Sequence, residues 1–244
     1  MKTYTIALAG NPNTGKSTLF NALTGMRQHT GNWAGKTVMT ASGEFQYNGI
    51  SYQIIDLPGT YSLYSNSADE EVARDYLILE DPDVTIVVLD ATALERNLNL
   101  ALQVMEITNR VVICINLIDE ARRLGIRIDL KKLRERLGVP VVAISARTRQ
   151  GVEELLDHVE QVASGRLVPK PLQIVYGDEI ERRIKELEPH ILRIVGNRFP
   201  SRWVALRLLD GDESLLELLK RNESSELSYQ GRTEVITHEY PSCH

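Results

Sequence analysis

Short apolar stretches alternate with amphipathic stretches along the first two thirds of the chain. The apolar runs lie near residues 4–9, 51–56, 84–90, 111–116 and 141–144, and each has the length of a buried strand. Between them apolar residues recur at helical spacing, as Leu19, Phe20 and Leu23 do. This alternation predicts an α/β fold, with a mainly parallel sheet covered by helices on both faces.

Two departures from this alternation concern the segment between the first helix and residue 56. Residues 40–47 and 51–56 read as strands joined by Asn48-Gly49, a pair that favours a tight hairpin turn. We therefore expect one antiparallel edge strand. Residues Arg27 to Thr37 have neither helical nor strand periodicity, so we expect a mobile loop there.

The last third of the chain has a different pattern. Pro169-Lys170-Pro171 predicts a stiff linker, and apolar residues then recur at helical spacing up to about residue 219, which predicts a small all-α domain. We expect a first domain over 1–165, a linker over 166–172 and a helical domain over 173–244. The signal fades after about residue 223, and we interpret His238, Cys243 and His244 as a frayed end rather than a metal site.

Composition narrows the class of protein. The 244 residues are 43% hydrophobic and 25% charged, with a net charge of −5, which is typical of a globular protein and gives no electrostatic case for nucleic acid as a partner. Cys114 and Cys243 are too few for a disulfide framework and fit a reducing cytoplasm. We recognise no secretory signal and no apolar run long enough to cross a bilayer.

A phosphate-binding loop follows the first predicted strand. Residues 10–17 read Gly-Asn-Pro-Asn-Thr-Gly-Lys-Ser and satisfy G-x-x-x-x-G-K-[ST], in which backbone N–H groups and a helix N-terminus surround phosphate oxygens. The lysine adds positive charge, and the Ser17 hydroxyl is placed to bind Mg²⁺. The expected nucleotide-binding residues here are Gly10, Asn11, Pro12, Asn13, Thr14, Gly15, Lys16, Ser17 and Thr18.

Two switch loops, Arg27 to Thr37 and Leu57 to Val72, are expected to change with the nucleotide and to sense the outer phosphate. Thr37 would place its hydroxyl on Mg²⁺ when a third phosphate is present. Asp56-Leu57-Pro58-Gly59 ends a strand, where ligand-binding groups collect in open α/β sheets. Asp56 would hold the metal, most simply through a bound water, and the Gly59 N–H would reach the third phosphate.

The base is expected to lie beside two later strand ends. In Asn116-Leu117-Ile118-Asp119, the carboxylate of Asp119 can accept hydrogen bonds from guanine N1–H and its 2-amino group, whereas adenine offers no such pair. The sequence therefore predicts GTP rather than ATP. Leu117 stands where such motifs usually have a lysine. Ser145-Ala146-Arg147 completes the site, with the Ala146 N–H toward guanine O6 and Ser145 bracing the loop.

In order and spacing these motifs resemble those of the translation-factor-related GTPases, and in detail the cytoplasmic N-terminal part of ferrous iron transport protein B, FeoB. The shared stretches are Gly10 to Gly25, Gly31 to Gly35, Asp56 to Leu63, Asp90-Ala91-Thr92 and Leu94 to Leu98. The resemblance implies a GTPase domain and a helical domain that couple slow GTP hydrolysis to an Fe²⁺ permease region of the same polypeptide, in a bacterial inner membrane.

The resemblance also implies K⁺ beside the phosphates, bound by Asn13 and by backbone carbonyls of Gly31 to Trp33. Such an ion would neutralise charge that develops between the phosphates, and Asn13, Lys16, Thr37 and Gly59 are the expected catalytic residues. Thr60 stands where Ras-like enzymes have a water-orienting glutamine, so hydrolysis is expected to be slow. We interpret Arg27 and Lys36 as solvated loop residues, and Met39 departs from the acidic residue often found there.

Other functions remain open from the sequence. The chain could be a regulatory switch in which GTP or GDP occupancy controls a partner and turnover is incidental. A ribosome-assembly GTPase is a third possibility, although the acidic composition and lack of an RNA-binding appendage count against it. Small cytoplasmic accessory proteins of an iron transport system are further possible partners.

Overall fold

The structure is a computed structural model that describes residues 2–25, 28–32, 38–64, 67–196, 199–212 and 215. The chain divides into two compact units, Met1–Val175 and Tyr176–His244. The division falls between Val175 and Tyr176, close to the predicted linker. Each unit is described by itself.

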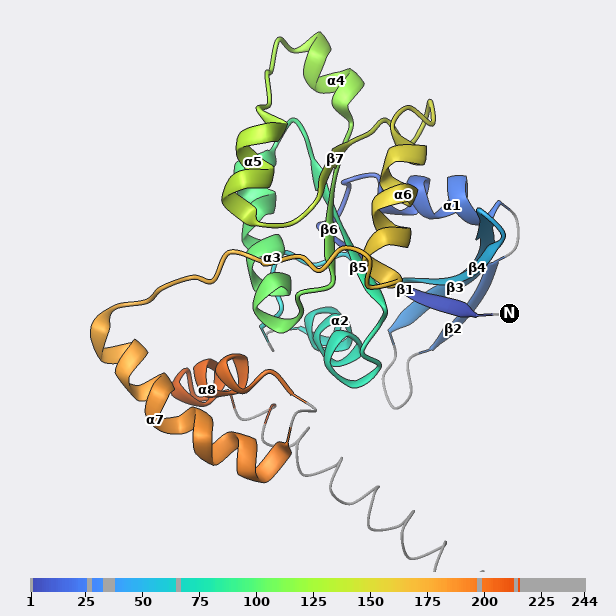
Figure 1. The fold of residues 1–244 in the computed structure, drawn as a ribbon. Coiled ribbons are helices and arrows are strands. Elements are labelled where there is room, and N and C mark those ends of the chain that lie inside the picture. The colour runs from blue at the N-terminus through green and yellow to red at the C-terminus, as the bar shows by residue number, and fades with distance from the viewer. Residues whose placement is uncertain are drawn as a thin grey trace, which may run out of the picture. The chain divides into compact units, whose positions relative to one another are not determined.

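The first unit is built on a seven-stranded sheet with the order β2-β3-β4-β1-β5-β6-β7 (Figure 1). The five strands from β4 to β7 in this order are parallel, and β3 runs antiparallel to both of its neighbours, β4 and β2. This confirms the predicted α/β class. The strands are β1 Thr3–Gly10, β2 Gln28–Asn32, β3 Met39–Tyr47, β4 Ile50–Asp56, β5 Val84–Asp90, β6 Val111–Asn116 and β7 Val141–Ala143.

The antiparallel edge contains the predicted hairpin and one strand that the sequence did not predict. Asn48 and Gly49 both have positive φ, 50° and 74°, as a two-residue hairpin turn requires. The expectation that residues 27–37 form an irregular loop was wrong for β2, which pairs with β3 from Gln28↔Gly43 to Asn32↔Met39. An edge strand is held by backbone hydrogen bonds and needs no apolar face, so its residues showed no strand periodicity.

Helices cover both faces of the sheet (Figure 1). On one face α1 (Lys16–Thr24) and α6 (Val152–Ala163) bury Leu19, Phe20 and Leu155 in a core with the alternating residues Ile6 and Leu8 of β1. On the other face lie α3 (Leu94–Ile107) and α2 (Ala68–Leu79). Because β5 and β6 are covered on both faces, they are almost wholly buried, as in other parallel sheets.

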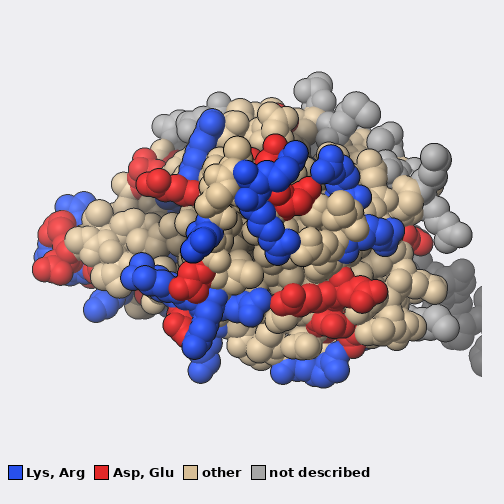
Figure 2. All heavy atoms as spheres, turned by 90° about the horizontal axis from the view of Figure 1, so that it is seen from above, with Lys and Arg blue, Asp and Glu red and all other residues tan. Residues whose placement is uncertain are grey.

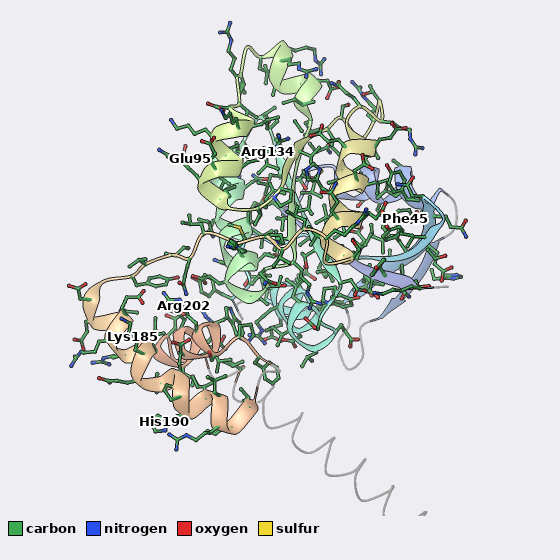
Figure 3. The ribbon with its side chains drawn as sticks, in the orientation of Figure 1. Phe45, Glu95, Arg134, Lys185, His190 and Arg202 are labelled. Atoms are coloured by element: carbon green, nitrogen blue, oxygen red, sulfur yellow. The ribbon has the colours of Figure 1, made fainter. Side chains whose placement is uncertain are left out.

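Two short helices complete this unit at the β6–β7 side. They are α4 (Ile118–Arg123) and α5 (Leu130–Leu137). Arg134 of α5 (Figure 3) donates from Nε to the Val141 carbonyl at 2.7 Å and from Nη2 to Glu154 of α6 at 3.0 Å. One side chain thus ties α5 to the edge strand β7 and to the next helix.

The predicted linker segment lies against the first unit. Lys170 N donates to Gly138 O at 3.0 Å, and Leu172 N donates to Leu137 O at 2.8 Å. Gly138 has φ +70°, and a Cβ there would lie 1.9 Å from Lys170 O. The close approach of the two backbones therefore requires glycine.

The second unit contains α7 (Asp178–Val195) and α8 (Ser201–Leu209). Ile184 and Ile191 of α7 are buried, as are Trp203 and Val204 of α8, which fits the predicted helical pattern. Arg202 of α8 (Figure 3) forms an ion pair with Glu181 of α7 through two hydrogen bonds. The helical pattern beyond residue 215 and the three tail residues His238, Cys243 and His244 lie outside the described residues.

Among the described residues, no helix is both long and apolar enough to span a bilayer. On the face shown in Figure 2, basic and acidic side chains of the described residues are interspersed. That face therefore presents no broad area of one charge sign. Such an area would attract a highly charged partner over a distance.

Candidate nucleotide-binding site

The phosphate-binding loop connects β1 to α1 and depends on two glycines. Gly15 has φ +77°, and a Cβ there would lie 2.3 Å from Asn116 Nδ2. At Gly10 a Cβ would lie 2.7 Å from the carbonyl oxygen of Val88 in β5. The glycines of the motif are thus fixed both by the turn and by close packing on the neighbouring strands.

A cleft of about 540 Å³ opens at this loop. Its size suits a small-molecule ligand. Seven loop residues form one side and Gly59 approaches from the opposite segment, where its Cβ position lies 3.3 Å from Pro12 Cα. The lining residues are Asn11, Pro12, Asn13, Gly15, Lys16, Ser17, Thr18 and Gly59, so the structure brings most of the predicted phosphate-binding residues together.

Lys16 and Ser17 line the cleft and contact Asp56 at the end of β4. Lys16 Nζ contacts Asp56 Oδ1 and donates to Leu57 O at 2.6 Å, and Ser17 Oγ lies 3.4 Å from Asp56 Oδ2. Burial raises the pKa of Asp56, and the neighbouring lysine and serine oppose that rise. A hydroxyl and a carboxylate side by side are oxygen ligands of the type that Mg²⁺ prefers, so the residues fit the expected metal.

Asn116 connects the phosphate loop to the predicted base-binding loop. Its Nδ2 donates to Thr14 O at 2.9 Å, and its Oδ1 accepts from Ala146 N at 3.0 Å. Asn116 is 1% exposed. The asparagine side chain thus accepts the Ala146 N–H in this structure, and the contact of that N–H with guanine O6 stays a prediction.

Asp119 lies in the first turn of α4, after Leu117 in the left-handed conformation with φ 62°. Its Oδ2 accepts a hydrogen bond from Arg147 Nη2 at 3.0 Å. Burial tends to raise the pKa of Asp119, but hydrogen bonds from Arg147 and Ser145 outweigh it and lower the pKa. The carboxylate is thus ionised and able to accept hydrogen bonds at neutral pH.

The segment after Asp56 is held by its neighbours. Thr60 N donates to Gly10 O at 3.2 Å, and Thr60 Oγ1 donates to Ser62 O at 2.8 Å. Thr60 is 4% exposed, so its hydroxyl does not project into the cleft. The second loop was expected over Leu57 to Val72, but α2 begins at Ala68 after the capping residue Ser67, which shortens it.

Of the residues expected to bind K⁺, the structure describes Asn13 and Gly31. Asn13 lines the cleft with φ 66°. Gly31 lies in β2, and its carbonyl accepts from Thr40 Oγ1 at 3.5 Å. Trp33 and Thr37 lie outside the described residues, as do Arg27 and Lys36, and of Met39 only its place in β3 is described.

Contacts from α3 to the segment after Gly59 escaped the sequence analysis. Gln103 Oε1 accepts from Leu63 N at 2.7 Å, and the Arg96 guanidinium lies 4.4 Å from the centre of the Tyr61 ring. Arg96 lies in Leu94 to Leu98, one of the stretches shared with FeoB, but the sequence did not indicate what it contacts. Gln103 gave no signal, because its contact depends on the packing of α3.

Comparisons with known proteins identify the family. The family model described as "Ferrous iron transport protein B" matches residues 4–159, and the model of the FeoB cytosolic helical domain matches residues 176–240. The chain belongs to the FeoB family. It has the G domain and the helical domain of that family.

Individual relatives agree with this assignment. The Fe(2+) transporter FeoB of Methanocaldococcus jannaschii is 43% identical over 233 residues, which are 91% of this chain and 33% of that protein. The Escherichia coli FeoB is 37% identical over 87% of this chain and 27% of its own length. The chain thus spans about a third or less of these FeoB relatives.

Solved structures of FeoB cytosolic domains have the same fold. The T. maritima domain in apo form has a TM-score of 0.82 and 40% identity, over 90% of this chain and 86% of that one. The T. maritima domain in its GMPPNP form has a TM-score of 0.80 and 37% identity, over 99% and 88% of the two chains. That FeoB domain therefore holds a guanine nucleotide analogue in a closely similar fold.

Proposed function

We propose that this FeoB chain binds guanine nucleotides and hydrolyses GTP. One observation carries the proposal. The buried side chain of Asn116 links the phosphate loop to the loop that holds the ionised carboxylate of Asp119. Asn116 joins Thr14 of the phosphate loop to Ala146, next to the residues that hold Asp119. The T. maritima FeoB domain solved with GDP or GMPPNP supports the same assignment.

The base is recognised by Asp119 in this proposal. Its two oxygens accept from guanine N1–H and the 2-amino group, while Leu117 packs beside the base. An Asp119→Asn variant replaces one acceptor by a donor, which suits the 2-carbonyl of xanthine. We expect the variant to lose GDP affinity by at least about 100-fold and to gain affinity for xanthosine diphosphate, as measured by fluorescence titration. Unchanged GDP affinity would contradict the role of Asp119.

Hydrolysis is expected to depend on charge neutralisation at the phosphates. Lys16 would bind the outer phosphate oxygens, and Ser17 with Asp56 would hold Mg²⁺, which stabilises developing negative charge when bound. Thr37 would complete that metal site, and the Gly59 N–H would contact the third phosphate. With Thr60 directed to Ser62 O, its side chain does not orient water, so turnover is expected to be slow.

Potassium ion is the proposed activator, with Asn13 as a side-chain ligand and carbonyls of the Gly31 to Trp33 segment as further ligands. The direct test is GTP turnover in KCl and in NaCl at equal ionic strength, for wild type and for Asn13→Ala. We expect K⁺ to stimulate the wild type several-fold and not the variant. Asn99→Ala, an exposed asparagine on α3, is the matched control and should retain the stimulation. Stimulation that survives in Asn13→Ala would contradict this role.

The relatives named Fe(2+) transporter suggest the wider setting. We propose that this chain is the cytoplasmic part of a bacterial inner-membrane Fe²⁺ transporter, joined to a permease region and open to small accessory proteins. In cells that express the complete transporter, Lys16→Ala should abolish radiolabelled Fe²⁺ uptake while the protein remains in the membrane. Uptake equal to wild type would separate nucleotide binding from transport.

A further inference from the structure

The contact between Arg147 and Asp119 uses the carboxylate that is proposed to recognise guanine. Arg147 Nη2 lies 3.0 Å from Asp119 Oδ2, and the arginine side chain is 74% exposed whereas that of Asp119 is 27% exposed. Arg147 follows Ser145 and Ala146, so it projects from the loop expected to lie beside the base. Its guanidinium therefore reaches Oδ2, one of the two oxygens that guanine is proposed to use.

The guanine edge and the Arg147 guanidinium are chemically alike as hydrogen-bond donors to this carboxylate. The N1–H, C2 and 2-amino atoms of guanine form a guanidine fragment with two parallel N–H donors. The arginine guanidinium offers the same arrangement together with a positive charge. Guanine uses both oxygens of this carboxylate, so the hydrogen bond from Arg147 to Oδ2 competes with one of the two guanine donors for that oxygen.

We propose that Arg147 is an intramolecular competitor of guanine for Asp119. The inference rests on the proposed guanine-nucleotide function and adds to it a residue that sets affinity and base preference. When the base binds, the arginine side chain swings away into solvent. When the base leaves, the arginine returns to the carboxylate, and the next base must displace it.

The surrounding contacts allow the side chain to move without the loop. Ser145 N is bound to Gln150 O at 3.0 Å, and Ala146 N is bound to Asn116 Oδ1. The first bond closes the loop between residues 145 and 150, and the second fixes the residue before Arg147. Arg147 donates to Asp119 from Nη2, and its side chain is mostly exposed. Exposed ion pairs are weak, so the competition is worth at most about fivefold in affinity.

Arg147 occupies one carboxylate oxygen of Asp119, which predicts an effect on base preference. Arg147 contacts Oδ2 alone, so a base with a single donor could share the carboxylate with it. Hypoxanthine retains N1–H but lacks the 2-amino group. Arg147 should therefore compete more strongly with GDP than with inosine diphosphate, and its removal should increase the preference for GDP.

The test measures binding of fluorescent GDP and inosine diphosphate analogues to wild type and Arg147→Met, which keeps the aliphatic stem. We expect GDP affinity to rise about two- to fivefold in Arg147→Met, with the larger part in the association rate and a smaller gain for inosine diphosphate. High salt should reduce the difference, because it screens the ion pair. Arg122→Met is the matched control. This exposed arginine of α4 faces the same loop through Gln150 at 3.4 Å, and its loss should not raise affinity.

Each outcome is decisive. Lower GDP affinity in Arg147→Met would overturn the proposal and assign Arg147 to holding the nucleotide. Equal changes in Arg147→Met and Arg122→Met would also overturn it, because they would reflect net charge only. If wild-type protein fails to bind GDP, the proposed function itself fails, whereas GDP binding with an unchanged Arg147→Met variant removes only the competitor.

Discussion

At the scale of single residues, Gly15 is subject to two constraints at once. Its φ of +77° lies in the left-handed region, and its missing Cβ leaves room for Asn116 Nδ2 at 2.3 Å. The same asparagine holds the Thr14 carbonyl and the Ala146 N–H. A side chain at position 15 would therefore disturb both the phosphate loop and the loop beside the base.

A glycine-to-alanine pair separates these two costs. Gly165 has φ +73° with open space around its Cβ position, so Gly165→Ala should cost only the left-handed strain, about 1 kcal/mol. Gly15→Ala adds a clash with Asn116, so we expect a larger loss of stability in urea unfolding and at least a tenfold loss of GDP affinity. Equal effects of the two substitutions on stability and affinity would show that the contact with Asn116 is unimportant.

Single residues also show how far sequence reasoning reached into the site. The phosphate loop was predictable because its residues are contiguous and their spacing fixes their geometry. The partner of the Ala146 N–H was not, because it depends on where the Asn116 side chain points between two loops. The ion pair of Arg147 with Asp119 was missed for the same reason, although both residues had been singled out.

At the scale of elements, an ion pair joins the two helices of the second unit. Glu181 of α7 accepts hydrogen bonds from both terminal nitrogens of Arg202 at 2.7 and 2.9 Å, and one from Tyr176 N at 2.9 Å. The arginine and the backbone N–H lower the pKa of Glu181 from its ordinary 4.5 to about 2. A lowered carboxyl pKa stabilises the folded state above pH 4.5, and that contribution is lost as the pH falls toward 2.

Thermal melting tests this linkage. Trp203 is buried in α8 and reports on the second unit in a Trp33→Phe background. Glu181→Gln should melt at a lower temperature than its parent at pH 7, and the difference should shrink as the pH falls from 5 to 3. Glu186→Gln, an exposed glutamate of the same helix, should show no such trend. A Glu181→Gln difference that is constant with pH would contradict the lowered pKa.

Elements also mark where periodicity stops being informative. The buried parallel strands were predictable because covering on both faces demands continuous apolar runs. The strand β2 was not predicted, because edge pairing uses the backbone alone. The start of α2 at Ala68 came earlier than expected because Ser67 accepts from Glu70 N at 3.3 Å and caps the helix, a signal that was present but unused.

At the scale of the whole molecule, the segment between the units belongs structurally to the first. Its backbone bonds from Lys170 and Leu172 to the end of α5 replace partners that the helix end would otherwise lack. The predicted linker is thus part of the nucleotide-binding unit up to Val175. Sequence composition indicated a stiff segment but could not show that its backbone hydrogen bonds to Gly138.

Truncation checks this assignment. A chain that ends at Val175 should fold and bind GDP within about threefold of the full chain. A chain that ends at Val168 lacks both backbone hydrogen bonds to α5, so it should be less stable by about 1–3 kcal/mol in urea unfolding. Equal stability of the two truncated chains would show that residues 169–175 add nothing to the first unit.

The central claim is that this FeoB chain selects a guanine nucleotide through its phosphate loop and Asp119. Calorimetric titration of the wild-type chain with GDP and with ADP, both with Mg²⁺, tests it most directly. The account predicts that GDP binds more tightly by about 10⁴-fold, because adenine leaves the carboxylate without its donors. Comparable affinities for GDP and ADP would contradict it.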